Sequence, residues 1–122
     1  METYKEIEGF DGVYAVSNYG NVLNKKTGRV LKPKDNVGYA RIGLNKNGIK
    51  YSFLVHRLVL IAFNYIENHK NFMVNHKNRN PMDNRVENLE WCTNTQNQIH
   101  WRADELFNKS KLLKAVKKAI PL

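Results

Sequence analysis

Short runs of alternating hydrophobic and polar residues, separated by glycine-containing turns, fill the first half of the chain. Alternation with a period of two between such turns is typical of β-strands. In the fourth run, Ala40, Ile42 and Leu44 fall on one face, with polar and aromatic residues on the other. We therefore expect a small antiparallel sheet with one buried face. The expected strands are 13–17, 21–24, 29–32, 39–44 and 50–55.

A continuous apolar run from His56 to Phe63 follows the last of these strands. A helix that is hydrophobic on nearly every side is a buried one, so this run predicts a core helix against which the sheet packs. We expect His56 to be a helix cap or a hydrogen-bonding group and His69 to lie in a loop.

The next segment predicts two short strands, separated by a long polar loop and followed by a helix. The strands are expected at 72–74 and 89–92, with Asn75 and His76 directly after the first. Thr93 with a glutamine three residues later is a capping-box pattern, which predicts that a helix begins there.

The last stretch, 104–120, predicts an amphipathic helix with apolar residues on one side and lysines on much of the other. Such a helix could lie on nucleic acid, dock on the domain or pair with another chain, and the pattern leaves these alternatives open. Its modest apolar face disfavours a role at a membrane surface.

The 122 residues carry a net charge of +9, and this excess is unevenly distributed. Residues 13–57 carry +8 and residues 93–122 carry +4, whereas residues 58–92 are neutral. An excess of this size indicates a polyanionic partner, most often nucleic acid. We expect the two basic segments to grip a phosphate backbone, although each single lysine also fits a solvated surface. The candidates are Lys25, Lys26, Arg29, Lys32, Lys34, Arg41, Arg57, Lys111, Lys114, Lys117 and Lys118.

The cysteine content and the apolar runs exclude several classes of protein. The single Cys92 excludes an internal disulfide and a zinc site built on cysteine pairs. The first residues lack the apolar core of a secretory signal, and the run at 58–63 is too short to cross a bilayer. We expect a soluble protein of a reducing compartment with no membrane role.

His76 is the first candidate for catalysis, because a histidine can take a proton from water at neutral pH. Asn75 and Asn97 offer amide oxygens, which suit a hard cation such as Mg²⁺. Together these groups would make a one-metal phosphodiesterase. The residues alone leave a second interpretation open, namely an asparagine-rich polar loop that contains a hydrogen-bonded histidine.

Two sets of strings carry a resemblance to known proteins. Three strings closely resemble a module found ahead of nuclease domains: IEGFDGVYAVSNYG, GRVLKP and VHRLV. Three later strings resemble the HNH nuclease motif: VNHK, NRVENLEW and QNQIH. In this order they cover about residues 3–101, and the combination resembles the HNH homing endonucleases encoded by phages and introns.

The resemblance implies roles for individual residues. His76 matches the general base that activates the attacking water, and Asn88 matches a residue that braces the loop between the strands. Asn75 and Asn97 match two ligands of a divalent metal ion, Mg²⁺ with Mn²⁺ as the alternative, and His100 could replace or supplement Asn97. Well-known members carry Asp at the position of Asn75, so we expect weaker metal binding.

The resemblance also implies an α+β fold in three parts. These are an N-terminal antiparallel β-sheet with a core helix (1–66), a ββα-metal HNH finger (67–103) and a basic C-terminal helix (104–122). The implied activity is metal-dependent hydrolysis of DNA, with a monomer nicking one strand of a duplex in the cytoplasm of a phage-infected bacterial cell. The alternative is a catalytically weak nucleic-acid-binding module that retains the HNH fold.

Overall fold

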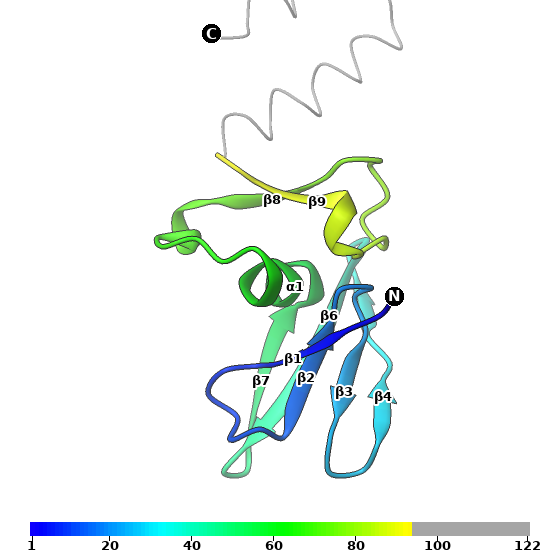
Figure 1. The fold of residues 1–122 in the computed structure, drawn as a ribbon, viewed down its shortest axis with the longest axis vertical. Coiled ribbons are helices and arrows are strands. Elements are labelled where there is room, and N and C mark those ends of the chain that lie inside the picture. Colours follow the sequence, from blue (N-terminus) through cyan, green and yellow to red (C-terminus); the bar gives the residue numbers. More distant parts are fainter. Residues whose placement is uncertain (94–122) are drawn as a thin grey trace, which may run out of the picture.

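The structure is a computed structural model that describes residues 1–93 as three antiparallel sheets and one α-helix (Figure 1). The first sheet has the strand order β1 (Tyr4–Glu6), β2 (Tyr14–Ser17), β3 (Val22–Asn24) and β4 (Arg29–Leu31). The second has the order β5 (Lys34–Asn36), β6 (Tyr39–Lys46) and β7 (Ile49–Leu54). The third pairs β8 (Met73–His76) with β9 (Leu89–Cys92). The helices are α1 (Val55–Phe63) and two short 3₁₀ helices, η1 (His69–Asn71) and η2 (Val86–Asn88).

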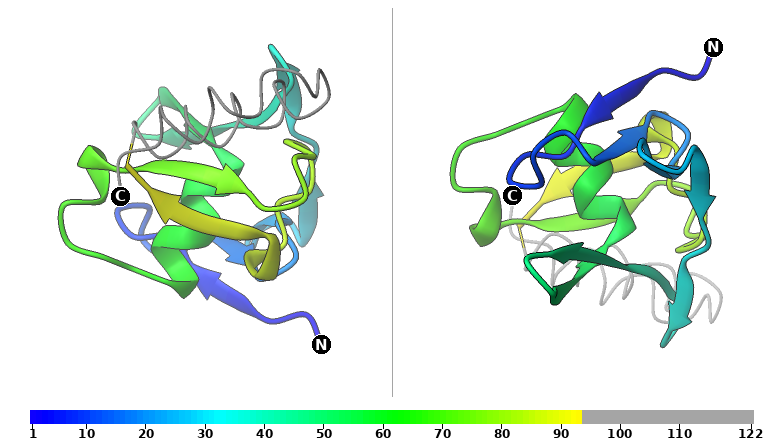
Figure 2. Two further views of the ribbon diagram at one scale, coloured as in Figure 1. Left: turned by 90° about the horizontal axis from the view of Figure 1, so that it is seen from above. Right: turned by 90° about the horizontal axis from the view of Figure 1, so that it is seen from below.

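Helix α1 lies between the N-terminal sheets and the β8–β9 hairpin (Figure 1). Seen from above, the green and yellow strands of this hairpin cross over the helix (Figure 2). Val55, Val59 and Leu60 of the helix are fully buried. Because apolar residues cover nearly every side of α1, it can pack on strands β2, β6 and β7 and also on β9 and η2. The predicted core helix is confirmed.

The predicted single sheet is wrong, because the strands form two sheets that divide between β4 and β5. Pro33 lies at the division, and a proline has no backbone N–H with which to continue a strand ladder. Strands β1 and β5 were not predicted. Each has only three residues, none of which is buried, and therefore shows no hydrophobic alternation. The alternation predicted for β6 is confirmed, since Ala40, Ile42 and Leu44 are buried.

Two histidine predictions also change. The N-cap of α1 is Leu54, so the prediction of His56 as the cap is wrong, and His56 is instead buried in the first turn. His69 begins the short helix η1, where a loop was predicted.

The α+β class is confirmed. The helix expected to open at Thr93 lies outside the described residues, as does the basic helix expected at 104–120. The same applies to several candidate site residues, namely Asn97, His100, Lys111, Lys114, Lys117 and Lys118. Within residues 1–93, no helix is long and apolar enough to span a membrane.

Candidate active site

The β8–β9 hairpin brings the candidate catalytic residues to the end of β8. In its register, Asn75 lies opposite Glu90 and His76 lies opposite Leu89. The loop that joins the two strands, residues 77–88, returns beside the end of β8. The geometry of this loop therefore decides what surrounds His76.

Asn88 ties the two ends of this loop together. Its Oδ1 accepts a hydrogen bond from the backbone N–H of Asn78 at 3.0 Å. Its Nδ2 donates to Oδ1 of Asn78 at 3.0 Å and to the carbonyl oxygen of Asp83 at 2.9 Å. Both amide hydrogens and the amide oxygen are thus used. The Asn88 carbonyl also accepts from the backbone N–H of Lys77 at 2.8 Å, immediately after His76.

Asp83 and Arg85 clamp the loop on both sides of Asn84. The Arg85 Nε and Nη2 atoms each lie 2.8 Å from one oxygen of the Asp83 carboxylate, which is a two-point contact. Asn78 donates to the same carboxylate at 2.7 Å. The Arg85 hydrogen bonds are the main reason that the pKa of Asp83 is held well below its usual range. Asn84 is therefore held between two fixed neighbours.

His76 is only 2% exposed and is hydrogen-bonded to this loop. Its Nε2 lies 2.9 Å from Oδ1 of Asn84. Because an amide oxygen only accepts hydrogen bonds, Nε2 carries the proton of the neutral ring and Nδ1 carries the lone pair. The arrangement selects one tautomer of His76, the one in which Nδ1 can act as a base.

Two further rings pack around His76. The His56 ring meets it edge-on with the ring centres 5.4 Å apart, and the Tyr39 ring lies 6.1 Å away. Burial lowers the pKa of His56 to about 3, with smaller contributions from the charges of His76, Arg57 and Arg41. His56 is therefore neutral at neutral pH and packs on His76 as an uncharged ring.

The side chain of Asn75 combines a bonded nitrogen with an unbonded oxygen. Nδ2 donates to Oε1 of Glu90 at 2.8 Å, whereas Oδ1 is buried and has no hydrogen-bond partner within residues 1–93. A buried carbonyl oxygen without a partner is costly, and an oxygen donor of this kind fits a hard cation. The described part of the chain contains no group of three or more His, Cys, Asp or Glu side chains that could hold a metal. Within residues 1–93, the unpaired amide oxygen of Asn75 is therefore the feature of this site that suits a cation.

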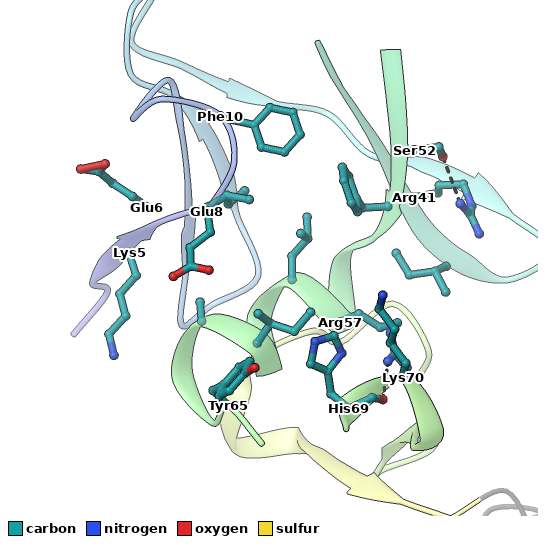
Figure 3. A pocket seen from close by; sticks show the side chains of 16 residues that line it. Lys5, Glu6, Glu8, Phe10, Arg41, Ser52, Arg57, Tyr65, His69 and Lys70 are labelled. Atoms are coloured by element: carbon teal, nitrogen blue, oxygen red, sulfur yellow. Dashed lines mark hydrogen bonds between the residues drawn. The ribbon is translucent and has the colours of Figure 1, made fainter. Parts of the chain in front are cut away.

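The guanidinium of Arg57 makes hydrogen bonds and a ring contact within the protein. Its Nη1 donates to the carbonyl of Phe72 at 2.9 Å and its Nη2 to that of His69 at 2.7 Å. The guanidinium also stacks 5.1 Å from the ring centre of Trp91. Figure 3 shows Arg57 beside His69 in the wall of a cavity of about 820 Å³. These contacts join α1 to η1 and β9, and they engage the Arg57 guanidinium within the protein.

Three of the other basic candidates line a groove of about 580 Å³ across β5, β6 and β7. Arg41 donates to Ser52 Oγ at 3.0 Å on this surface (Figure 3). Lys50, which was not among the predicted residues, lies across Gly43, where a Cβ atom would overlap its side chain. The basic residues that line the groove are Lys32, Lys34, Arg41 and Lys50.

Three further candidate residues lie apart from this groove, two on the turn between β3 and β4 and one at the start of β4. Lys26 of the turn and Arg29 of β4 are exposed. Lys25 forms an ion pair with Glu6 at 3.3 Å between two largely exposed side chains.

Comparison with known proteins identifies the family to which this chain belongs. Residues 2–45 match the NUMOD4 motif, and residues 53–99 match the HNH endonuclease family. The chain is 40% identical to the DNA endonuclease I-HmuI of Bacillus phage SP01, over 98% of this chain and 70% of that protein. The chain belongs to the HNH homing endonucleases.

Two further matches support this membership. An uncharacterized HNH endonuclease of Acanthamoeba polyphaga mimivirus is 42% identical over 71% of this chain. The solved structure of I-HmuI, which concerns DNA binding and cleavage by that enzyme, superposes with a TM-score of 0.76 at 39% identity. The chain spans 26% of the mimivirus protein and 66% of the solved I-HmuI chain. The resemblance to HNH homing endonucleases is therefore confirmed.

Sequence reasoning missed three residues that this HNH structure brings to the site or its basic groove. Asn84 stands in an asparagine-rich loop, where no periodic pattern distinguishes one amide from the next. Glu90 could have been found by aligning the two predicted strands of the hairpin, which places it opposite Asn75. Lys50 begins its predicted strand, and its contact with Gly43 depends on the pairing of β6 with β7.

Proposed function

We propose that this protein is a metal-dependent DNA endonuclease that nicks one strand of a duplex, with His76 as the general base. The observation that carries the proposal is the pairing of His76 Nε2 with Asn84 Oδ1 at 2.9 Å, which leaves Nδ1 as the basic nitrogen. The neighbouring residue, Asn75, supplies a buried amide oxygen without a partner. The family membership and the DNA endonuclease activity of the relative I-HmuI support the same assignment.

The proposed reaction is the hydrolysis of a phosphodiester. Nδ1 of His76 accepts a proton from water while the water oxygen attacks phosphorus. The bond from phosphorus to the 3′ oxygen breaks, which yields a 5′ phosphate and, after protonation, a 3′ hydroxyl. Asn84 Oδ1 accepts the hydrogen bond from Nε2–H throughout, and it therefore stabilises the ring as the ring becomes positively charged.

Asn75 and Asn97, with His100 as a replacement or further ligand, would hold the divalent cation, which we propose to be Mg²⁺ or Mn²⁺. When bound, this cation stabilises the negative charge that develops on the leaving oxygen. Asn88 keeps the intervening loop folded and has no proposed contact with the reacting atoms. Glu90 supports Asn75 from the opposite strand.

We further propose that the enzyme binds the duplex as a monomer through its basic surfaces. The groove across β5–β7 and the turn between β3 and β4 present exposed cations to phosphates, and the lysines of the C-terminal segment extend the contact. Because I-HmuI comes from a phage of Bacillus, we place the reaction in the cytoplasm of an infected bacterial cell.

A plasmid assay tests the proposed activity. Supercoiled DNA incubated with the protein and Mg²⁺ or Mn²⁺ should become open circles, and EDTA should prevent this. Replacing the base, His76→Ala, should slow nicking by about 100-fold or more. The control His69→Asn changes a histidine of η1 and should stay within about threefold of the wild-type rate. Equal residual nicking by the wild type and His76→Ala would exclude His76 as the base.

A second candidate function is DNA binding with little or no cleavage. The presence of Asn75 where well-known members carry Asp favours it, because the site lacks one formal negative charge. Tight, salt-dependent binding without nicking in any divalent metal would establish this alternative, and metal-dependent nicks would rule it out.

A further inference from the structure

The turn that joins β2 to β3 packs against the loop that carries Asn84, although the two lie far apart in the sequence. The carbonyl of Asn18 accepts a hydrogen bond from the backbone N–H of Val86 at 2.8 Å. A Cβ atom built on Gly20 would lie 2.9 Å from both the Cβ and the carbonyl oxygen of Asn84. Since real Cβ atoms do not approach so closely, only glycine fits at position 20 without moving Asn84.

The turn is itself tightly held. Ser17 is fully buried, and its Oγ accepts hydrogen bonds from the backbone N–H groups of Tyr19 at 3.1 Å and Asn21 at 3.0 Å. Gly20 adopts φ of +89°, a conformation that favours glycine. A turn held in this way offers Asn84 a firm surface, and it belongs to the part of the chain that matches the NUMOD4 motif.

We propose that Gly20 is a positioning residue for the general base, acting through Asn84. Gly20 supports the backbone of Asn84, and Asn84 Oδ1 holds Nε2 of His76 at 2.9 Å. The inference rests on the proposed function, in which His76 is the base. By this route the N-terminal part of the chain contributes to the chemical step in addition to binding DNA.

The matched pair Gly20→Ala and Gly9→Ala tests the proposal. Both glycines have φ of +89°, so an alanine at either position must adopt the same unfavourable φ, but nothing lies within 4 Å of a Cβ atom at Gly9. Nicking is measured under single-turnover conditions with saturating plasmid, together with the dissociation constant for the same DNA. Circular dichroism reports the folded fraction of each variant.

We expect Gly20→Ala to lower the single-turnover rate by about tenfold or more, because misplacing a reacting group by a fraction of an ångström is costly. DNA affinity should change by less than about twofold, and Gly9→Ala should keep the wild-type rate for its folded fraction. Equal rates for the two folded variants would overturn the proposal. A wild-type protein that does not nick DNA would instead refute the proposed function, so the two failures are distinguishable.

A spectroscopic measurement provides a readout that does not depend on activity. Long-range ¹H–¹⁵N correlation spectra of histidine-labelled protein show which ring nitrogen of His76 is protonated. The wild type, Gly9→Ala and Asn84→Asp should show protonated Nε2, because each retains the acceptor at position 84. Gly20→Ala and Asn84→Leu should show a mixture of tautomers. Unchanged His76 signals in these last two variants would contradict the positioning role.

Discussion

Asn75 donates its amide hydrogen to the carboxylate of Glu90 at 2.8 Å, directly across the β8–β9 pair. A carboxylate only accepts hydrogen bonds, so the pair fixes which end of the Asn75 amide faces Glu90. The amide oxygen is left buried and unpaired within the described part of the chain. The two residues therefore act as one unit, and a change in one requires a matching change in the other.

Restoring the aspartate of other family members should destabilise this protein when Glu90 is kept. Asn75→Asp places two acceptors with like charges against each other and removes a hydrogen bond to a charged group. We expect the free energy of unfolding to fall by about 2 kcal/mol at pH 7. Urea denaturation in EDTA measures this loss. The double variant Asn75→Asp with Glu90→Gln should recover most of it, because the glutamine amide can donate.

The same double variant should bind Mg²⁺ more tightly than the wild type, since a carboxylate is a stronger ligand than an amide. The increase in Tm on adding Mg²⁺ reports the affinity without requiring cleavage. Glu90→Gln alone is the control and should show no such increase over the wild type. If Asn75→Asp alone were as stable as the wild type in EDTA, the proposed coupling would not exist.

Asn88 should contribute strongly to stability, because its amide makes three hydrogen bonds within the loop. Asn88→Ala should lower the free energy of unfolding by about 2 to 3 kcal/mol, at roughly 1 kcal/mol for each bond lost. The exposed Asn45 provides a control, and Asn45→Ala should change stability by less than about 0.5 kcal/mol. Similar losses in the two variants would show that the loop does not depend on Asn88.

His56 should make the protein sensitive to acid. The folded state lowers the pKa of His56 from 6.5 to about 3, mainly by burial, so the unfolded chain takes up a proton that the folded chain does not. This contribution to stability is fully present above pH 6.5 and is lost as the pH falls toward 3. Between pH 7 and pH 4.5 we expect a loss of about 2 to 3 kcal/mol from this group.

The variant His56→Phe isolates that effect, since it keeps a ring against Tyr39 and His76 but cannot take up a proton. Its free energy of unfolding, measured in urea from pH 7 to pH 4.5, should fall less steeply than that of the wild type. Parallel curves for the two proteins would assign the acid sensitivity to other groups.

The groove across β5–β7 should contribute to the salt dependence of DNA binding. Replacing Lys32 and Lys34 by glutamine should reduce the slope of log K against log salt by up to about 2, because each phosphate contact contributes about 0.9. The control Lys5→Gln with Lys70→Gln removes the same charge from residues that line the cavity of Figure 3. Equal reductions in both double variants would indicate a general charge effect without a role for the groove.

The sequence predicted those parts of the structure that carry a local hydrophobic pattern. Helix α1 was found from its continuous apolar run, and β6 was found from its alternation. The division into two sheets was missed because Pro33 interrupts the ladder between two short strands. The internal role of Arg57 was missed because net charge treats every arginine alike, whereas stacking on Trp91 depends on the folded hairpin.

The residues around His76 show a second limit of prediction. The contact between His76 and Asn84 spans eight residues of a polar loop, and the one between Gly20 and Asn84 joins distant segments. Neither leaves a periodic signal, because both depend on how the loop packs. The resemblance to a nuclease motif pointed to His76, but it did not indicate what holds the ring. The metal roles of Asn97 and His100 stay predictions, since both residues lie outside the described part of the chain.

Helix α1 also determines how this enzyme could change its target during evolution or by design. It belongs to the segment that matches the HNH family, yet Val59 and Leu60 share one core with Val16 and Ile42 of the N-terminal sheets. Exchanging one half alone for that of a relative would leave the side chains of that shared core mismatched. Under the proposed binding of DNA at the β5–β7 groove, new specificity is therefore more accessible through point changes on that surface than through the exchange of whole modules.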